Sequence, residues 1–321
     1  MVKTNILLES GTNELEIVEF YMDEMPREDG SESHRSYFGI NVAKVLEIIR
    51  NPKLTDLPEI SSPAVLGAFN LRDRIIPLVD LGLWLKKSIV KKAMPKVIVT
   101  EFNKITTAFS VSGVTRIHRI SWEEVEAPSN YVASLAAYSI TGVVRLENRI
   151  IYILDMEKIV ADLNPGIMDT SPVEGRHKDA VKDKHLVALL CDDSSMARNT
   201  MKTLLEEAGF KVHAFTNGRG SWDQLVEWKE LAKEYDKSIT QFVDVVVSDI
   251  EMPVMDGHNL TRRIKEDLML RELPVILCSS IITDALRHKG ETVGANDQVS
   301  KVDMNLLVEH ILKALETNAQ E

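Results

Sequence analysis

Acidic, hydroxyl and basic side chains stand at the ends of apolar segments in the second half of the sequence. Asp192 and Asp193 follow the first segment, Asp249 follows the third, Ser279 closes the fourth and Lys301 follows the fifth. Apolar segments separated by helical patterns are typical of buried strands in a parallel sheet. Because the carboxyl ends of parallel strands meet at one edge, we expect these side chains to converge there.

The expected cluster has the composition of a magnesium and phosphoryl site. Three neighbouring carboxylates repel one another unless a cation lies among them, and oxygen ligands with retained waters suit Mg²⁺. The backbone carbonyl of Glu251 offers a further oxygen ligand. Lys301 supplies an ammonium and Ser279 a hydroxyl, which would neutralise the charge of a phosphoryl group carried by Asp249. An isolated Asp249 would instead only cap the turn after its strand.

The elements that must position this cluster alternate between strands and helices from residue 186 onward. A helix is expected from Ser194 or Ser195 to Ala208, because serine is a favoured N-cap and Gly209 a favoured helix stop. The segment 222–242 is longer than one crossover requires, which predicts an extended second helix. Five strands interleaved with helices imply a doubly wound α/β sheet. We predict strands at 186–191, 212–215, 243–247, 274–279 and 297–299, and a last helix over 303–315.

Residues 186–318 resemble the receiver domain of bacterial response regulators. The acid pair, the motif DIEMPVMDG at 249–257, the serine and the lysine occur in the family's order and carry the resemblance. It implies a flavodoxin-like fold with a five-stranded parallel sheet, and Mg²⁺ as the cofactor. The implied roles are Asp249 as phosphoacceptor, Asp192, Asp193 and the Glu251 carbonyl as Mg²⁺ ligands, Lys301 as the phosphoryl contact and Ser279 as the phosphoryl sensor.

One position departs from the receiver pattern. Many receivers have Tyr or Phe three residues before the lysine, where the ring moves inward as the hydroxyl approaches the phosphoryl group, whereas this sequence has Gln298. A signal would therefore pass through the Ser279 loop, the following helix and the Gln298 strand by a different two-state element. The sequence does not identify that element.

The first half of the chain, from Glu14 to about Leu163, has the pattern of an all-β domain. Short segments rich in β-branched residues alternate with turn signals. A repeat lies within it: 67–81 aligns with 142–156, and six of the fifteen positions are identical. A second element repeats more loosely, since 38–48 resembles 109–117. The duplication predicts two small SH3-like barrels. Strands are expected at 16–21, 37–42, 74–79, 96–101, 106–111 and 149–154.

The segments FGINVAKVLEI at 38–48 and GAFNLRDRIIPLVDL at 67–81 resemble the signature of CheW, the chemotaxis coupling protein. The resemblance covers about 14–163. It implies a scaffold that joins the histidine kinase CheA to the cytoplasmic tips of chemoreceptors. The family usually has Gly where this chain has Asp73, and Asp tolerates a left-handed turn better than most residues.

Three residues match motif positions that the CheW resemblance associates with partner contact: Val45, Glu47 and Arg72. The arginine can make forked contacts with a carboxylate on a partner helix. The plainer alternatives are that Val45 belongs to the barrel core and that Arg72 is a solvated loop charge.

Between the two halves, 164–185 contains Pro, Gly and many charges without an apolar period, and we predict an exposed linker there. We therefore expect a CheW-like domain at 14–163 and a receiver domain at 186–318, with 1–13 as a leader of no clear pattern.

Composition limits the kinds of partner. The chain has 321 residues and a formal net charge of −11, which would repel nucleic acid and anionic membrane surfaces. No segment has the length and apolarity of a signal peptide or a membrane span, so we expect a cytoplasmic protein without direct membrane insertion. Cys191 and Cys278 fall at the ends of predicted buried strands and are expected to be reduced thiols.

Together the halves resemble the CheV family, in which a CheW-like domain is fused to a receiver. The resemblance implies a phosphorylation-regulated adaptor, not an enzyme, recruited to receptor arrays at the inner membrane. One alternative is a phosphate sink that only drains phosphoryl groups from CheA. A second is a receiver-gated enzyme, but the first half lacks the hydrolase, zinc-protease, P-loop and dinucleotide motifs. A DNA-binding regulator is disfavoured because no helix-turn-helix follows Lys301.

Overall fold

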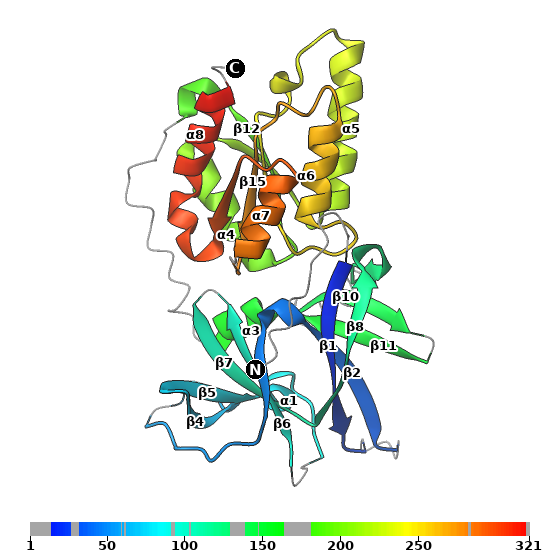
Figure 1. Ribbon diagram of the computed structural model, residues 1–321, viewed down its shortest axis with the longest axis vertical. Coiled ribbons are helices and arrows are strands. Elements are labelled where there is room, and N and C mark those ends of the chain that lie inside the picture. Colours follow the sequence, from blue (N-terminus) through cyan, green and yellow to red (C-terminus); the bar gives the residue numbers. More distant parts are fainter. Residues whose placement is uncertain are drawn as a thin grey trace. The chain divides into compact units, whose positions relative to one another are not determined.

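The computed structural model describes residues 14–26, 32–58, 60, 62–90, 94–102, 104–128, 139–146, 148–163, 181–281 and 284–318. The predicted leader lies outside these residues, as does most of the predicted linker. The chain divides into two compact units, formed mainly by residues 15–169 and 170–321, and each is described by itself (Figure 1). The predicted domain boundaries at 14–163 and 186–318 stay predictions.

The first unit contains two sheets with matching strand order. One sheet runs β8-β1-β2-β11-β10-β9 and the other runs β3-β6-β7-β5-β4. All the predicted strands are present, with ends shifted by up to three residues. The strands are β1 (Glu14–Glu24), β2 (His34–Asn41), β3 (Val45–Arg50), β4 (Val65–Leu71), β5 (Arg74–Asp80), β6 (Lys96–Phe102), β7 (Ile105–Val111), β8 (Gly113–Ser121), β9 (Val125–Glu126), β10 (Ile140–Leu146) and β11 (Arg149–Leu154).

The two sheets exchange strands with each other. After the β1–β2 hairpin the chain leaves its sheet, and β3 becomes the edge strand of the other sheet. After the β6–β7 hairpin the chain returns in the same way, and β8 becomes the edge strand of the first sheet. The repeated segments therefore occupy equivalent places, with β2 and β3 matching β7 and β8, and β4 and β5 matching β10 and β11.

The repeat's identical glycines lie at β-bulges. The register of the β4–β5 pair shifts between Val65 and Gly67, and that of the β10–β11 pair shifts between Ile140 and Gly142. Gly67 has φ +140°, and a Cβ there would lie 2.7 Å from the Thr55 carbonyl oxygen. These positions require glycine because the bulge brings another segment against the backbone.

The repeat's identical aspartates begin short helices after the two hairpins. Asp80 Oδ1 accepts from the Leu83 amide at 3.0 Å, and Asp155 Oδ1 accepts from the Lys158 amide at 2.9 Å. Each side chain thereby satisfies an amide that has no partner within the first turn. The helices are α1 (Leu81–Trp84) and α3 (Met156–Leu163), and the unit also contains the 3-10 turn η1 (Val42–Lys44). A further 3-10 turn, η2 (Trp122–Glu124), follows β8 in the chain.

The β4–β5 turn confirms the expectation for Asp73. Arg72 and Asp73 both have positive φ, 50° and 66°, as a two-residue hairpin loop with right-handed strand twist requires. The Asp73 amide donates to Asn70 Oδ1 at 3.1 Å. The turn therefore forms without the glycine that the family usually has there.

The second unit is the predicted doubly wound sheet. Five parallel strands have the order β13-β12-β14-β15-β16, with helices on both faces (Figure 1). The strands are β12 (Val187–Cys191), β13 (Lys211–Phe215), β14 (Val245–Asp249), β15 (Val275–Ser279) and β16 (Asp297–Ser300). The helices are α4 (Ser195–Ala208), α5 (Gly218–Glu234), α6 (Gly257–Glu266), α7 (Asp284–Thr292) and α8 (Leu307–Asn318), with 3-10 turns η3 (Lys182–Lys184), η4 (Ile239–Gln241) and η5 (Lys301–Leu306).

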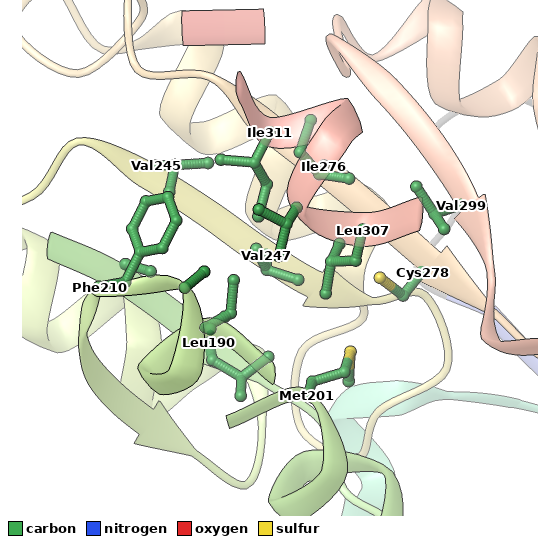
Figure 2. Packing of buried hydrophobic residues seen from close by; sticks show 14 of the residues in the cluster. Leu190, Met201, Phe210, Val245, Val247, Ile276, Cys278, Val299, Leu307 and Ile311 are labelled. Carbon is green, nitrogen blue, oxygen red and sulfur yellow. The ribbon is translucent and has the colours of Figure 1, made fainter. Parts of the chain in front are cut away.

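Both faces of the sheet are buried, which explains why its strands are continuous apolar runs. On one face, Leu190, Val247 and Ile276 pack against α4 and α8, as Figure 2 shows. On the other face, Leu189 and Val246 pack against α5 and α6. The sheet is therefore a rigid base for the side chains at its carboxyl edge.

Three details differ from or refine the sequence predictions. The helix expected over 303–315 is a 3-10 turn, η5, followed by α8, because Asp303 has the non-helical angles φ −105° and ψ 33°. The predicted extension of the second helix is confirmed, since α5 has 17 residues. Near the end of the predicted linker, Val181 is buried, and its amide donates to the Ala208 carbonyl at 3.0 Å.

Candidate functional site

The acid pair lies in the turn between β12 and α4. Asp192 is buried and its Oδ1 accepts from the Ser194 amide at 2.8 Å, while Asp193 is half-exposed. Ser194 then caps α4, with its hydroxyl oxygen accepting from the Ala197 amide. The sequence places the pair here because the buried strand ends at Cys191 and the serine cap starts the helix at once.

Asp249 ends β14, next to the strand that carries the acid pair. It is 3% exposed, and its Oδ1 accepts from the Ile250 amide at 2.9 Å. The following loop folds back so that the Gly257 amide donates to the Ile250 carbonyl. A Cβ at residue 257 would lie 2.1 Å from the Asp249 carbonyl oxygen, so only glycine allows this return.

Lys301 joins the acids across the sheet edge. Its Nζ lies 2.9 Å from Asp192 Oδ2 and 3.2 Å from Asp249 Oδ1, and its side chain is only 2% exposed. A buried ammonium between two buried carboxylates is strongly held, because removing any partner leaves an uncompensated charge. The structure thus brings together residues that lie more than 100 positions apart in the sequence.

The acidic oxygens are close enough to bind one metal ion. Ligand atoms of Asp192, Asp193 and Asp249 all lie within 4.8 Å of one another. Three carboxylates face one ammonium in this cluster, and hard oxygen ligands suit Mg²⁺. The residues therefore fit Mg²⁺. The ligand role of the Glu251 carbonyl stays a prediction.

Ser279 ends β15 at the same edge, and its hydroxyl is bonded within its own loop. Its Oγ donates to the Ile281 carbonyl at 2.7 Å and accepts from the Ile281 amide at 3.1 Å. A phosphoryl group on Asp249 would have to compete with the Ile281 carbonyl for this proton. The sensing role stays a prediction.

Arg198 belongs to the site and was missed by the sequence reasoning. Its Nη1 donates to the Asp192 carbonyl at 2.7 Å and to the Asp193 carbonyl at 3.3 Å. One guanidinium on α4 therefore fixes the backbone of both acidic residues. The only sequence signal is an arginine on the first turn of the helix that follows an acid pair.

We expect Arg198→Met to weaken Mg²⁺ binding about tenfold, because residues that orient metal ligands typically contribute that much to affinity. Isothermal titration calorimetry of the full chain with Mg²⁺ measures this directly. Arg198→Lys keeps the charge but loses the planar guanidinium that fixes the direction of these bonds, and it should also weaken binding. Tighter binding in Arg198→Met would mean that charge repulsion of the metal outweighs orientation.

The loop after Asp249 contains a strained residue. Val254 has φ +69°, and the Met255 amide donates to the Pro253 carbonyl at 2.8 Å, which makes a tight three-residue turn. A β-branched residue is rarely found at positive φ, because its Cβ crowds the backbone.

We expect Val254→Asn to stabilise the receiver by about 1 kcal/mol, because Asn adopts positive φ more easily. The receiver's thermal transition in calorimetry should rise by about 3 °C. Val254→Ala keeps a Cβ at the same position and should gain less. An unchanged or lower transition for Val254→Asn would show that the turn is not strained.

The residues assigned to partner contact lie together in the first unit. Arg72 Nη2, at the tip of the β4–β5 turn, lies 3.2 Å from Glu47 Oε1 on β3, and their side chains are 75% and 24% exposed. Val45 starts β3 opposite Thr100 and is half-buried. Its burial is therefore intermediate between that of a barrel-core residue and that of an exposed contact residue. Their contact with a partner stays a prediction.

The cysteines are free and buried, as expected. Burial raises the pKa of the Cys191 thiol to about 12, and burial also raises the pKa of Cys278. Such thiols remain protonated and unreactive at neutral pH.

The two units define a chemotaxis-type signalling protein, with a CheW-like all-β part and a response-regulator receiver. The family described as CheW-like domain matches residues 31–164, and that described as response regulator receiver domain matches residues 188–312. The fold class predicted from the sequence is confirmed.

Relatives that match over most of the chain are found in Helicobacter pylori. The chemotaxis protein CheV3 is 35% identical over 96% of this chain and 96% of its own length, and CheV2 is 29% identical over 89% and 92%. The solved scaffolding protein TtCheW from Thermoanaerobacter tengcongensis matches 45% of this chain and 91% of its own at 21% identity, with a TM-score of 0.39. The chain belongs to the CheV family of chemotaxis proteins.

Within the described part of the chain, the helices are all too short or too polar to cross a lipid bilayer.

Proposed function

We propose that this protein is a phosphorylation-regulated chemotaxis adaptor that couples chemoreceptors to the histidine kinase CheA. The observation that carries the proposal is the cluster of Asp192, Asp193 and Asp249 with the Lys301 ammonium between them. A CheW-like part without this cluster would give a constitutive scaffold, and the cluster supplies a means of control. The role is that of an adaptor, not an enzyme.

The chemistry follows from the positions of the side chains. An Asp249 carboxylate oxygen attacks the phosphorus of a phosphohistidine on the kinase. A P–O bond forms while the P–N bond breaks, and its electron pair stays on the imidazole nitrogen. Lys301 Nζ, held 3.2 Å from Asp249 Oδ1, neutralises charge on the arriving phosphoryl oxygens. Receiver domains generally bind Mg²⁺ at this site, and when bound it would neutralise further charge.

The metal would be held by Asp192, Asp193 and Asp249, with the Glu251 carbonyl as a further ligand. Ser279 would turn its hydroxyl from the Ile281 carbonyl toward the phosphoryl group and so report its presence. The first unit would contact the kinase and the cytoplasmic tips of the receptors through the surface around Val45, Glu47 and Arg72. The protein would then act in the cytoplasm, at receptor arrays on the inner membrane.

Kinase activity in reconstituted receptor arrays tests the proposal. Wild type and Asp249→Ala should both couple receptor to kinase, but only wild type should change kinase activity after accepting phosphoryl groups. Radiolabel from phosphorylated CheA should move to wild type and not to Asp249→Ala. If Asp249→Ala alters only the drain of phosphoryl groups and leaves coupling control unchanged, the protein is a phosphate sink.

Arg72→Ala is expected to weaken incorporation into arrays without unfolding the first unit. The Arg72 side chain is 75% exposed, and ion pairs made by an exposed arginine contribute about 0–1 kcal/mol to stability. Co-sedimentation with receptor and kinase measures incorporation, and thermal unfolding measures the stability. Arg74→Ala is a matched control, because Arg74 pairs with Glu101 at 3.0 Å beside the same turn. Normal co-sedimentation of Arg72→Ala would contradict the contact.

A further inference from the structure

The aromatic position of the receiver pattern is occupied by Gln298, and its side chain makes a specific contact. Gln298 Nε2 donates to the Arg287 carbonyl of α7 at 2.7 Å. Gln298 lies on β16, opposite Leu277 of β15, three residues before Lys301. The strand that carries this amide therefore leads directly into η5, whose first residue supplies the ammonium of the phosphoryl site.

Gly290 provides the space for this contact. A Cβ at residue 290 would lie 2.0 Å from Gln298 Nε2, so any other residue would push the amide away. Glycine in a helix costs about 0.5–1 kcal/mol relative to alanine. Gly290 thus makes α7 less stable at the position where the Gln298 amide packs.

The helix also follows closely after Ser279, which ends β15 at the edge of the sheet that carries the site. Ser279 Oγ is bonded to the Ile281 carbonyl, and α7 begins three residues later at Asp284. Any movement of Ser279 toward Asp249 would pull on the segment that leads into α7. The Gln298 amide bond lies in the first half of that helix and would resist such a movement.

We propose that Gln298 is the positioning residue that holds α7 and, through it, the Ser279 loop, and that phosphorylation of Asp249 releases this bond. The inference rests on the proposed function, and it identifies the two-state element that replaces an inward-moving ring. A primary amide suits the role because it has two arrangements, bonded to the Arg287 carbonyl or turned to solvent. The half-exposed position of Gln298 allows the second arrangement.

Amide hydrogen exchange of the full chain tests whether the bond from Gln298 to the Arg287 carbonyl holds α7 before any phosphorylation. In Gln298→Met, residues of α7 should exchange about five- to tenfold faster than in wild type, as expected for the loss of one hydrogen bond. Gly290→Ala should have the same effect, although alanine favours the helix. The double variant should exchange no faster than either single variant, because both remove one contact. Slower exchange in Gly290→Ala, or unchanged exchange in Gln298→Met, would overturn the proposal.

The same measurement with Mg²⁺ and beryllofluoride, a mimic of the acyl phosphate, tests the release. Wild-type α7 should exchange faster when the mimic binds, and Gln298→Met should change less than twofold. Asp249→Ala should not respond. Transfer of label from phosphorylated CheA to wild type, measured in parallel, distinguishes failure of this inference from failure of the proposed function. Normal transfer with no change in α7 exchange would reject only the release of the Gln298 bond, whereas absent transfer would reject the proposed function.

Discussion

Lys301→Met is expected to slow phosphoryl transfer to Asp249 by about 10²–10³-fold, the usual loss when one charged donor is removed from a preorganised site. Transfer would be followed as loss of label from phosphorylated CheA in the presence of Mg²⁺. The physical reason is the position of Nζ, 2.9 Å from Asp192 Oδ2 and 3.2 Å from Asp249 Oδ1, on a side chain almost closed to water.

The same substitution should tighten Mg²⁺ binding while it slows transfer. Without the ammonium, Asp192 and Asp249 repel each other more strongly, and a divalent ion no longer competes with Lys301 for their oxygens. Titration calorimetry would therefore show a lower Kd for Mg²⁺ in Lys301→Met. The metal-free variant should also be less stable than the metal-free wild type, because two buried carboxylates have lost their partner.

Lys229→Met is the matched control. Lys229 Nζ pairs with Asp267 Oδ2 at 2.7 Å in the same unit, with a side chain that is also mostly buried. It should lower stability but leave phosphoryl transfer and Mg²⁺ affinity near those of wild type. If Lys301→Met transferred at the wild-type rate, the ammonium would have only a structural role. If Lys301→Met bound Mg²⁺ less tightly than wild type, Lys301 would be orienting the metal ligands and not competing with the metal for them.

Much of this site could be predicted from the sequence because its parts follow simple local rules. Each polar residue comes directly after an apolar run, and apolar runs buried on both faces must be parallel strands whose carboxyl ends share one edge. That argument needs no knowledge of pairing order. It therefore predicted that Asp192, Asp249 and Lys301 meet, although they are distant in the chain.

The contacts of Arg198 and Gln298 could not be predicted in the same way. Both side chains bond to backbone carbonyls, and a carbonyl acceptor leaves no mark in the amino-acid sequence. Gly290 is a partial signal for the second contact, but a helical glycine has several explanations. The break at Asp303 before the last helix could not be predicted either, because a single non-helical residue changes neither the apolar pattern nor the charge of the sequence.

The repeat in the first half predicted two similar parts but not the exchange of β3 and β8 between them. Hydrophobic alternation determines which face of a strand is buried, whereas the neighbour it pairs with is set by long-range packing. The identical Gly67 and Gly142 were visible in the alignment as conserved between the repeats. Their role at bulges became clear only from the register of the paired strands.

The first unit should lose stability in acid because of one buried carboxylate. Glu19 on β1 is fully buried, and Arg149 donates to it through Nε at 2.7 Å and Nη2 at 3.1 Å. His118 Nε2 lies 2.7 Å from Glu19 Oε2, and Thr115 Oγ1 donates to the same oxygen at 2.8 Å. The cluster ties β1 to β8 and β11 of the six-stranded sheet.

Burial alone would raise the pKa of Glu19, but the hydrogen bonds from Arg149, His118 and Thr115 outweigh it and lower the pKa from 4.5 to about 2. A lowered pKa in the folded state means that the carboxylate contributes its full stability above pH 4.5, the unfolded value. That contribution, about 3 kcal/mol by linkage, is lost as the pH falls from 4.5 to about 2.

Glu19→Gln should therefore destabilise the first unit by about 3 kcal/mol at pH 7, and the difference from wild type should shrink steadily below pH 4.5. Hydrogen exchange of peptides from β1 and β8, measured from pH 7 to pH 3 and corrected for intrinsic rates, follows this unit without interference from the receiver. Glu16→Gln is the matched control, since Glu16 pairs at 2.7 Å with the exposed Arg119 and should contribute little. A difference between Glu19→Gln and wild type that stays constant down to pH 3 would mean that Glu19 acts through shape and hydrogen bonding, not through its charge.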